Sequence, residues 1–330
     1  MFTGTEKVLK QINLLNNKIS ALQIQLNEVI DKKNKQLLNM IWLLRDKGKN
    51  LKDIQKDFFA SYPKANGFLR SVQLCNIKLL GEFQNFCLEN NIQFWLHAGT
   101  LIGAIRHQGF IPWDDDIDVA MLRKDFNKIR DLLKNNNVFQ LNEYYHDLKG
   151  SRGWQLKYKN KDIPVFIDIV IYDFCNIVPD SCESKEIYLQ KFRKVQAEMY
   201  DKFHIQLKAP QCIDIGYYHF GPYPEDNRKK VNKLYEEAQQ KLNPFLENGT
   251  HIFYAIDNYP FPYPVLRKEE LFPLKKINFE NVMVNIPCRP EFYLQGYGNI
   301  WQIPADIGDN NHIYCFEKFK QSIESFIKEK

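Results

Sequence analysis

The chain has 330 residues, of which 44% are hydrophobic, and its 45 basic and 40 acidic residues give a formal net charge of +5. This length and composition exclude a disordered or fibrous protein and are sufficient for one large hydrophobic core or two modest ones. The small positive charge weakly favours acidic substrates or an anionic membrane surface, and nothing in it calls for nucleic acid.

The seven cysteines show neither a C-x-x-C pair nor the spacing of zinc ligands, which favours a reduced setting. The amino terminus lacks the apolar core of a signal peptide, and no run of about 18 apolar residues could span a bilayer. We therefore expect a cytoplasmic protein whose association with a membrane, if any, is peripheral and on the inner face.

The first segment, residues 1–47, is predicted to be an amphipathic helix. Apolar residues recur in alternating steps of four and three over residues 8–29, as in a coiled coil. The same pattern fits a helix that packs on its own domain, so homo-oligomerisation through residues 8–29 and intramolecular packing are both open. Residues 48–67 are predicted to be a connector with a short helix.

Residues 68–180 are predicted to form a core of strands and helices. The patterns predict helices at 68–89, 101–106 and 125–135, and strands at 92–96, 113–121, 154–159 and 165–172. In the first of these helices, Gln73 and Asn76 interrupt the apolar face. Residues 181–330 are predicted to be mainly helical and rich in loops, with helices at 183–203 and 227–241. This mixture indicates an α/β or α+β core.

Four aspartates lie within the sequence DDDID at residues 114–118. If this segment is a strand, alternation places Asp114, Asp116 and Asp118 on one face and Asp115 on the other. Three carboxylates on one face repel one another until a divalent cation lies among them, and oxygen ligands suit Mg²⁺ or Mn²⁺. A solvated acidic turn is the alternative interpretation.

Two further features surround this motif. Gly99 and Thr100 follow a predicted strand and open a helix, so their backbone N–H groups can bind a phosphate. Arg106 and His107 could add donors, although His107 also fits a buried core histidine. Asp168 lies within the apolar strand VFIDIVIY, where an unpaired carboxylate is costly, so it is either a third metal ligand or a structural hydrogen-bond acceptor.

The segment GTLIGAIRHQGFIPWDDDIDVAM, at residues 99–121, closely resembles the signature of the LicD family, which includes fukutin and the fukutin-related protein. The likeness extends to FIDIVIYD at residues 166–173 and to residues 271–304, and covers roughly residues 69–304. It implies an α+β nucleotidyltransferase core like that of DNA polymerase β, with residues 181–330 completing the acceptor and donor site.

The resemblance also implies an activity. It is the Mg²⁺-dependent transfer of phosphocholine, or a related phospho-alcohol, from a CDP-linked donor such as CDP-choline to a hydroxyl of a cell-surface glycan, free or lipid-linked. It implies that Asp116, Asp118 and Asp168 are catalytic metal ligands with Asp114 as an accessory ligand. Gly99 and Thr100 would then contact donor phosphate.

Other side chains are candidates for recognition. Charge on the nucleotide or the transferred phosphate would be neutralised by Arg106, His107 and Lys157. A quaternary ammonium head group is best received by aromatic rings, and the candidates for the head group or the acceptor are Tyr297, Trp301 and Trp113. Packing within the domain is the commoner use of such rings.

Two rival functions stay open. The same metal geometry would serve a nucleotidyltransferase that moves NMP from an NTP to an acceptor. The amino-terminal helix would also suit a non-catalytic assembly factor. No nucleic-acid partner is expected, and the sequence leaves the head group and the acceptor sugar undetermined.

Overall fold

The computed structural model describes residues 33, 37, 41, 44, 48–146, 151–177, 181–207, 213–215, 218–220, 224–246, 249–258, 264–298 and 313–329. The predicted coiled-coil segment, residues 8–29, and Trp301 therefore lie outside the described residues. The chain divides into two compact units, Met1–Tyr62 and Pro63–Lys330. Among the described residues, no helix has both the length and the apolar character that crossing a membrane requires.

The first unit contains helix α2 (Leu51–Ser61), which matches the short helix predicted in the connector. Asn50 caps it, because its Oδ1 accepts a hydrogen bond from the backbone N–H of Asp53 at 3.0 Å. The rings of Phe58 and Phe59 pack edge to face within this helix, with centroids 5.1 Å apart.

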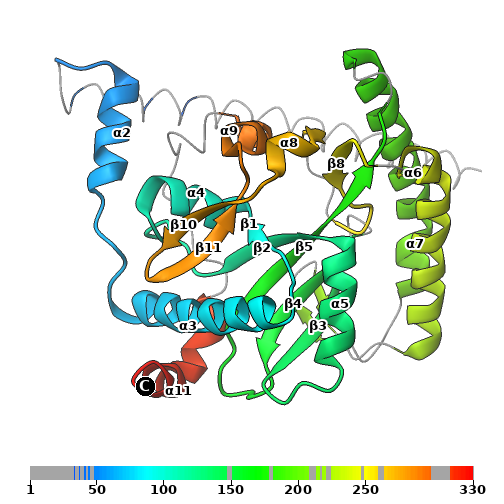
Figure 1. Cartoon of the computed structure of the whole chain (residues 1–330). Coiled ribbons are helices and arrows are strands. Elements are labelled where there is room, and N and C mark those ends of the chain that lie inside the picture. The colour runs from blue at the N-terminus through cyan, green and yellow to red at the C-terminus, as the bar shows by residue number, and fades with distance from the viewer. Residues whose placement is uncertain are drawn as a thin grey trace, which may run out of the picture. The chain divides into compact units, whose positions relative to one another are not determined.

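The second unit is built on a mixed sheet (Figure 1). Its strands are β1 (Trp95–Leu96), β2 (Ile117–Leu122), β3 (Phe139–His146), β4 (Ser151–Tyr158), β5 (Phe166–Cys175), β6 (Ile213–Ile215), β7 (Tyr218–Phe220), β8 (His251–Tyr254) and β9 (Leu266–Arg267). They run in the order β1-β2-β5-β4-β3-β7-β6, while β8 pairs with the end of β5 and with β9. β2 and β5 are parallel, and the other pairs are antiparallel.

One face of the sheet is apolar and carries the core. Ile117, Val119 and Met121 of β2 alternate onto it and are completely buried. Helices α3 (Gly67–Glu89) and α5 (Arg123–Leu133) cover this face (Figure 1). The ring of Phe86 in α3 packs on Phe139 of β3, and the ring of Phe126 in α5 packs on Trp154 of β4. The burial of the three β2 side chains is what fixes the register of β2, because a shift by one residue would expose them.

The opposite face carries the aspartates and is partly covered by later segments. Here lie helix α4 (Ala98–His107) and the short helices α8 (Lys268–Leu271) and α9 (Pro290–Tyr293). The hairpin of β10 (Lys275–Phe279) and β11 (Val282–Ile286) adjoins β1, where Asn285 Nδ2 donates to the backbone carbonyl of Phe94 at 2.9 Å. Tyr293 of α9 stacks on Tyr172 of β5, which places α9 on this face. The remaining elements are α6 (Cys182–Leu207), α7 (Glu225–Leu246), η2 (Leu294–Tyr297), α10 (Ile313–Phe316), η3 (Glu317–Phe319) and α11 (Lys320–Phe326).

The α+β class predicted from the sequence is confirmed. Helix α3 spans the predicted segment almost residue for residue, and β5 extends the predicted strand to Cys175. β3 was not predicted, and the carboxy-terminal half supplies strands β6 to β11 besides its helices. β8 joins the sheet through β5, so residues beyond 180 share the sheet of the aspartates.

Candidate active site

Three aspartates converge on one face of the sheet. Asp118 of β2 and Asp168 of β5 are direct Cα partners in the parallel pairing, so their side chains lie side by side. Asp116, just before β2, joins them, and one carboxylate oxygen from each of the three lies within 4.8 Å of the others. Residues far apart in the sequence thus present three oxygen ligands to one point in space.

A second acidic group adjoins the first. Asp114, Asp115 and Asp116 also bring carboxylate oxygens within 4.8 Å of one another. Asp114 lies close to α4, where a Cβ at Gly99 would be 2.9 Å from its Oδ2, so a larger residue at 99 would push this carboxylate away. Asp115 is buried, and its Oδ2 accepts the backbone N–H of Ile313 at 2.8 Å.

The predicted strand over 113–121 is wrong at its start, because β2 begins only at Ile117. The backbone carbonyls of Asp114 and Asp115 accept hydrogen bonds from side chains of α3 instead. Gln73 Nε2 donates to Asp114, and Asn76 Nδ2 donates to Asp115, each at 2.9 Å. The polar interruptions in the apolar face of α3 were the signal in the sequence, since a buried amide must find a partner.

The electrostatics of the cluster favour a cation. Burial raises the pKa of Asp118 well above its usual range, and the charges of Asp116, Asp168 and Asp114 raise it further. The pKa of Asp114 is raised for the same reasons, burial first and then Asp116. Clustered hard oxygen donors fit Mg²⁺ or Mn²⁺, and a divalent cation would offset the repulsion. Asp116, Asp118 and Asp168 would hold the ion, with Asp114 nearby.

The first turn of α4 supports the metal ligands. Thr100 Oγ1 accepts the backbone N–H of Asp118 at 2.8 Å, and the Thr100 side chain is only 1% exposed. Gly99 and Thr100, which were predicted to form a turn, therefore lie in the first turn of α4, and the Thr100 hydroxyl holds the backbone of β2 in place. Contact between these two residues and a donor phosphate stays a prediction.

Arg106 and His107 lie at the other end of α4. Arg106 Nε donates to His107 Nε2 at 2.9 Å. Burial lowers the pKa of His107 to about 4, and the charge of Arg106 adds to this, so His107 is neutral near pH 7 and acts here as an acceptor. Burial lowers the pKa of Arg106 to about 10 against the opposing effect of Asp114, so its guanidinium keeps its charge. His107 therefore orients Arg106.

The remaining predicted residues are less closely tied to the cluster. Lys157 lies on β4, with Nζ 5.1 Å from the centre of the Phe166 ring. Burial lowers its pKa, whereas the charge of Asp168 raises it. Trp113 and Tyr297 are half-buried. Their roles in binding a nucleotide, a head group or an acceptor stay predictions.

The sequence did not point to an aromatic cluster behind the aspartates. Tyr293 Oη accepts Trp95 Nε1–H at 3.0 Å and lies 2.6 Å from His97 Nδ1. The backbone N–H of His97 in turn donates to the carbonyl of Asp118 at 3.0 Å. Burial lowers the pKa of His97 to about 3, so this histidine is neutral and braces β2 rather than carrying charge.

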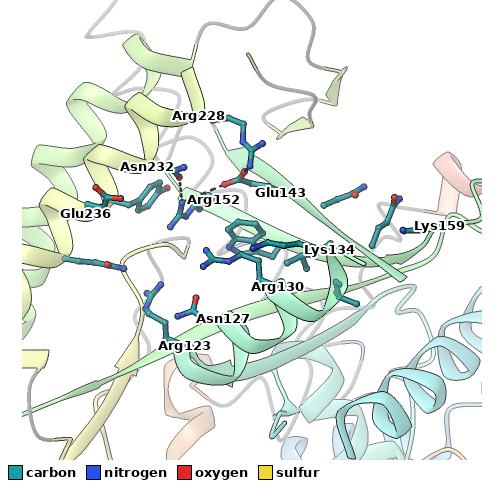
Figure 2. A pocket seen from close by; sticks show the side chains of 17 residues that line it. Arg123, Asn127, Arg130, Lys134, Glu143, Arg152, Lys159, Arg228, Asn232 and Glu236 are labelled. Atoms are coloured by element: carbon teal, nitrogen blue, oxygen red, sulfur yellow. Dashed lines mark hydrogen bonds and ion pairs between the residues drawn. The ribbon is translucent and has the colours of Figure 1, made fainter. Parts of the chain in front are cut away.

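The opposite face of the sheet holds a cavity of about 930 Å³ (Figure 2). It is lined by residues of α5, β3, β4 and α7, among them Gln140 and Asn142 of β3, and none of the clustered aspartates lines it. Behind it, the fully buried Asp257 accepts from Arg152 Nε at 2.7 Å and from Arg123 Nη2 at 2.5 Å. Burial alone would raise the pKa of Asp257, but the two guanidinium groups lower it well below its usual range.

Comparison with known proteins agrees with this geometry. Residues 91–207, which contain β1 to β5 and all the clustered aspartates, match the family model described as LicD/FKTN/FKRP, nucleotidyltransferase domain. Residues 91–207 are therefore similar to the nucleotidyltransferase domain of the LicD/FKTN/FKRP family.

Individual relatives are similar over parts of their length. The lipopolysaccharide cholinephosphotransferase LicD of Haemophilus influenzae is 35% identical over 147 residues, which are 39% of this chain and 52% of that protein. The human ribitol 5-phosphate transferase FKRP is 39% identical over 41 residues, 12% of this chain and 8% of that protein. An uncharacterised protein of Rickettsia typhi is 29% identical over 137 residues, 38% of this chain and 41% of that protein. The chain thus spans about half or less of the length of these relatives.

Proposed function

We propose that this protein transfers a phospho-alcohol group, phosphocholine above all, from a CDP-linked donor to a hydroxyl of a glycan. The observation that carries the proposal is the convergence of Asp116, Asp118 and Asp168 beside the amino-terminal turn of α4. The names of two relatives, a cholinephosphotransferase and a ribitol 5-phosphate transferase, support a phosphorus-containing group as the group transferred.

In this reaction the acceptor oxygen forms a bond to the distal phosphorus of the donor, and the bond from that phosphorus to the bridging oxygen breaks. CMP leaves, and the proton of the acceptor hydroxyl passes to a base. A bound Mg²⁺ would neutralise phosphate charge, which is the main requirement of phosphoryl-group transfer.

The protein's own residues supply position and proton transfer. Asp168 lies on the β5 side of the cluster, away from α4, and in this proposal its carboxylate orients the acceptor hydroxyl and accepts its proton. Arg106, which is charged and bonded to His107, neutralises the departing CMP in this proposal. Thr100 keeps the backbone of Asp118 in place during the step.

The test is CMP release. The purified protein is incubated with Mg²⁺, a glycan acceptor extract and, in turn, CDP-choline, CDP-ethanolamine, CDP-glycerol or CDP-ribitol. We expect CMP from one donor, no CMP with EDTA, and a loss of more than about 100-fold in Asp116→Asn, because even losing a residue that merely orients a metal ligand costs up to about 100-fold. Near-normal turnover in Asp116→Asn would refute the metal site.

The same assay separates the rival activity. A nucleotidyltransferase would consume CTP or another NTP and release pyrophosphate instead of CMP. Pyrophosphate formation that depends on Asp116, without CMP release from any CDP-alcohol, would replace the proposal with NMP transfer. A protein that releases neither product but binds partners through residues 1–47 would favour the assembly factor.

A further inference from the structure

The turn of the β10–β11 hairpin contacts the loop between α4 and β2, which carries Asp114 and Asp116. β10 lies close to α4 (Figure 1). In the turn, the backbone N–H of Glu280 donates to the carbonyl of Gln108 at 2.8 Å. The Glu280 side chain lies over Gly109, where a Cβ would be 2.5 Å from Oε1. A larger residue at 109 would therefore displace the Glu280 carboxylate.

Two buried rings join the hairpin to the same loop. Phe110 of the loop packs edge to face on Phe279, the residue before Glu280, and the ring centroids are 5.0 Å apart. Both side chains belong to the hydrophobic core. Apolar packing and a backbone hydrogen bond thus give Glu280 a fixed position relative to the loop of the aspartates.

The carboxylate of Glu280 binds two cations. Arg70 of α3 donates to it twice, from Nη1 to Oε1 and from Nη2 to Oε2, each at 3.1 Å, and Lys64 Nζ lies 2.6 Å from Oε2. Burial alone would raise the pKa of Glu280, but the hydrogen bonds from Arg70 and Lys64 lower it below its ordinary value, so the carboxylate is charged. The side chain of Arg70 is 22% exposed and that of Lys64 is 61% exposed, so Arg70 is the enclosed partner.

Arg70 also connects Glu280 to the aspartate motif. Its Nη1 donates to Gln73 Oε1 at 3.0 Å, and Gln73 Nε2 donates to the carbonyl of Asp114 at 2.9 Å. Gln73 is only 1% exposed. An amide that is buried and bonded at both its oxygen and its nitrogen cannot turn over without losing hydrogen bonds, so Arg70 fixes the orientation in which Gln73 holds Asp114. Among the described residues, Lys64 bonds Glu280 alone.

We propose that Arg70 is a positioning residue for the aspartate cluster, acting through Gln73 and anchored by Glu280. These three side chains, here named the Arg70 bridge, run from the hairpin turn to the backbone of Asp114. Because Asp114 lies two residues before Asp116, the bridge sets where the first carboxylates of the cluster lie. Residues that orient metal ligands without touching the metal are worth about 10- to 100-fold in metal affinity. This inference rests on the cation site of the proposed function.

The experiment measures cation binding without turnover. Mn²⁺ is titrated into the wild-type chain and its variants, free Mn²⁺ is followed by electron paramagnetic resonance, and only binding that Asp116→Asn abolishes is counted. We expect Arg70→Met and Gln73→Met, which keep much of the side-chain length but lose the hydrogen bonds, to weaken this binding by about 10-fold or more. Lys64→Met is the matched control. It removes the other, exposed cation from Glu280 without touching Gln73, and should change the affinity less than about 2-fold.

Urea unfolding of each variant separates positioning from a merely structural role, which would lower stability and leave the Mn²⁺ affinity of the folded protein unchanged. If Arg70→Met is poorly folded, Glu280→Gln takes its place and should also weaken Mn²⁺ binding, because an amide offers the guanidinium a single acceptor oxygen. The bridge is overturned if the folded variants bind Mn²⁺ as the wild type does, or if Lys64→Met weakens binding as much as Arg70→Met. Those results leave the cation site and CMP release untouched. If the wild type binds no Mn²⁺ that depends on Asp116, the cation site fails, and the role of the bridge fails with it.

Discussion

Two clusters of charged side chains lie on opposite faces of one sheet, and they differ in what balances the charge of their carboxylates. On one face, Asp116, Asp118 and Asp168 face one another, and burial together with mutual repulsion raises the pKa of Asp118. On the other, the completely buried Asp257 lies between two arginines that lower its pKa. Arginine side chains of the protein thus balance the charge of Asp257. No such balance lowers the pKa of Asp118, so the repulsion among the three aspartates indicates a binding site for a cation.

The largest expected effect is at the cluster itself. Asp118→Asn should lower turnover by more than about 100-fold, yet raise the melting temperature of the metal-free protein, because it removes one of the repelling carboxylates. Thermal melts with EDTA and with Mg²⁺ test this. The wild type should gain stability from Mg²⁺ and the variant should gain little. A variant less stable than the wild type in EDTA would contradict the repulsion.

Asp257→Asn should instead lower the stability of the protein. Removing one partner of a buried ion pair leaves uncompensated charge and costs about 3–5 kcal/mol of unfolding free energy. Here two guanidinium groups would lose their common acceptor, and only Arg123 would keep a bidentate pair, with Asp173. Urea unfolding measures the loss. Asp131→Asn, which breaks the exposed pair between Asp131 and Lys134, is the control and should cost less than about 1 kcal/mol. Equal costs for the two variants would mean that Asp257 is not a structural ion pair.

The two clusters also differ in how far the sequence predicts them. The aspartates of the first lie in a compact motif and in an apolar strand, so alternation and chemistry suffice to predict that Asp116, Asp118 and Asp168 meet. The second joins Arg123 to Asp257, 134 positions apart. No local pattern connects them, because their contact depends on Asn258, whose side chain bonds both the N–H and the carbonyl of Ile171 in β5.

The same distinction explains the elements that were missed. β3 reads FQLNEYYH, whose polar residues suggest no buried strand. The structure shows why: Gln140, Asn142 and Tyr144 are half-exposed, and β3 gains its place by pairing with β4 and β7. Helix α3 was predicted by its apolar spacing, but the use of Gln73 and Asn76 to hold the backbone before β2 depends on tertiary contact.

The ion pairs of Asp257 should also make the free energy of unfolding depend on pH in acid. Its carboxyl has a lower pKa in the folded chain than the ordinary value of 3.8, so its contribution to stability is complete above about pH 4 and is lost as the pH falls through the folded pKa. The difference in unfolding free energy between the wild type and Asp257→Asn should therefore narrow below pH 4. Urea unfolding at pH 7, 4, 3 and 2.5 follows it. A gap that stays constant down to pH 2.5 would mean that the charge of Asp257 is not what stabilises the fold, and a gap that widens would contradict the ion pair.

The smallest loss of activity and stability is expected from a substitution at Thr100, where α4 contacts the backbone of Asp118. Thr100→Val keeps the size of the side chain but removes the acceptor for the backbone N–H of Asp118, which should cost about 1–3 kcal/mol of unfolding free energy. Because that backbone carries a metal ligand, turnover should also fall by about 10- to 100-fold. Thr100→Ser keeps the hydroxyl and should retain most of both. If the serine variant loses as much turnover as the valine variant, the packing of the threonine methyl group, and not the hydrogen bond to Asp118, is what holds β2 against α4.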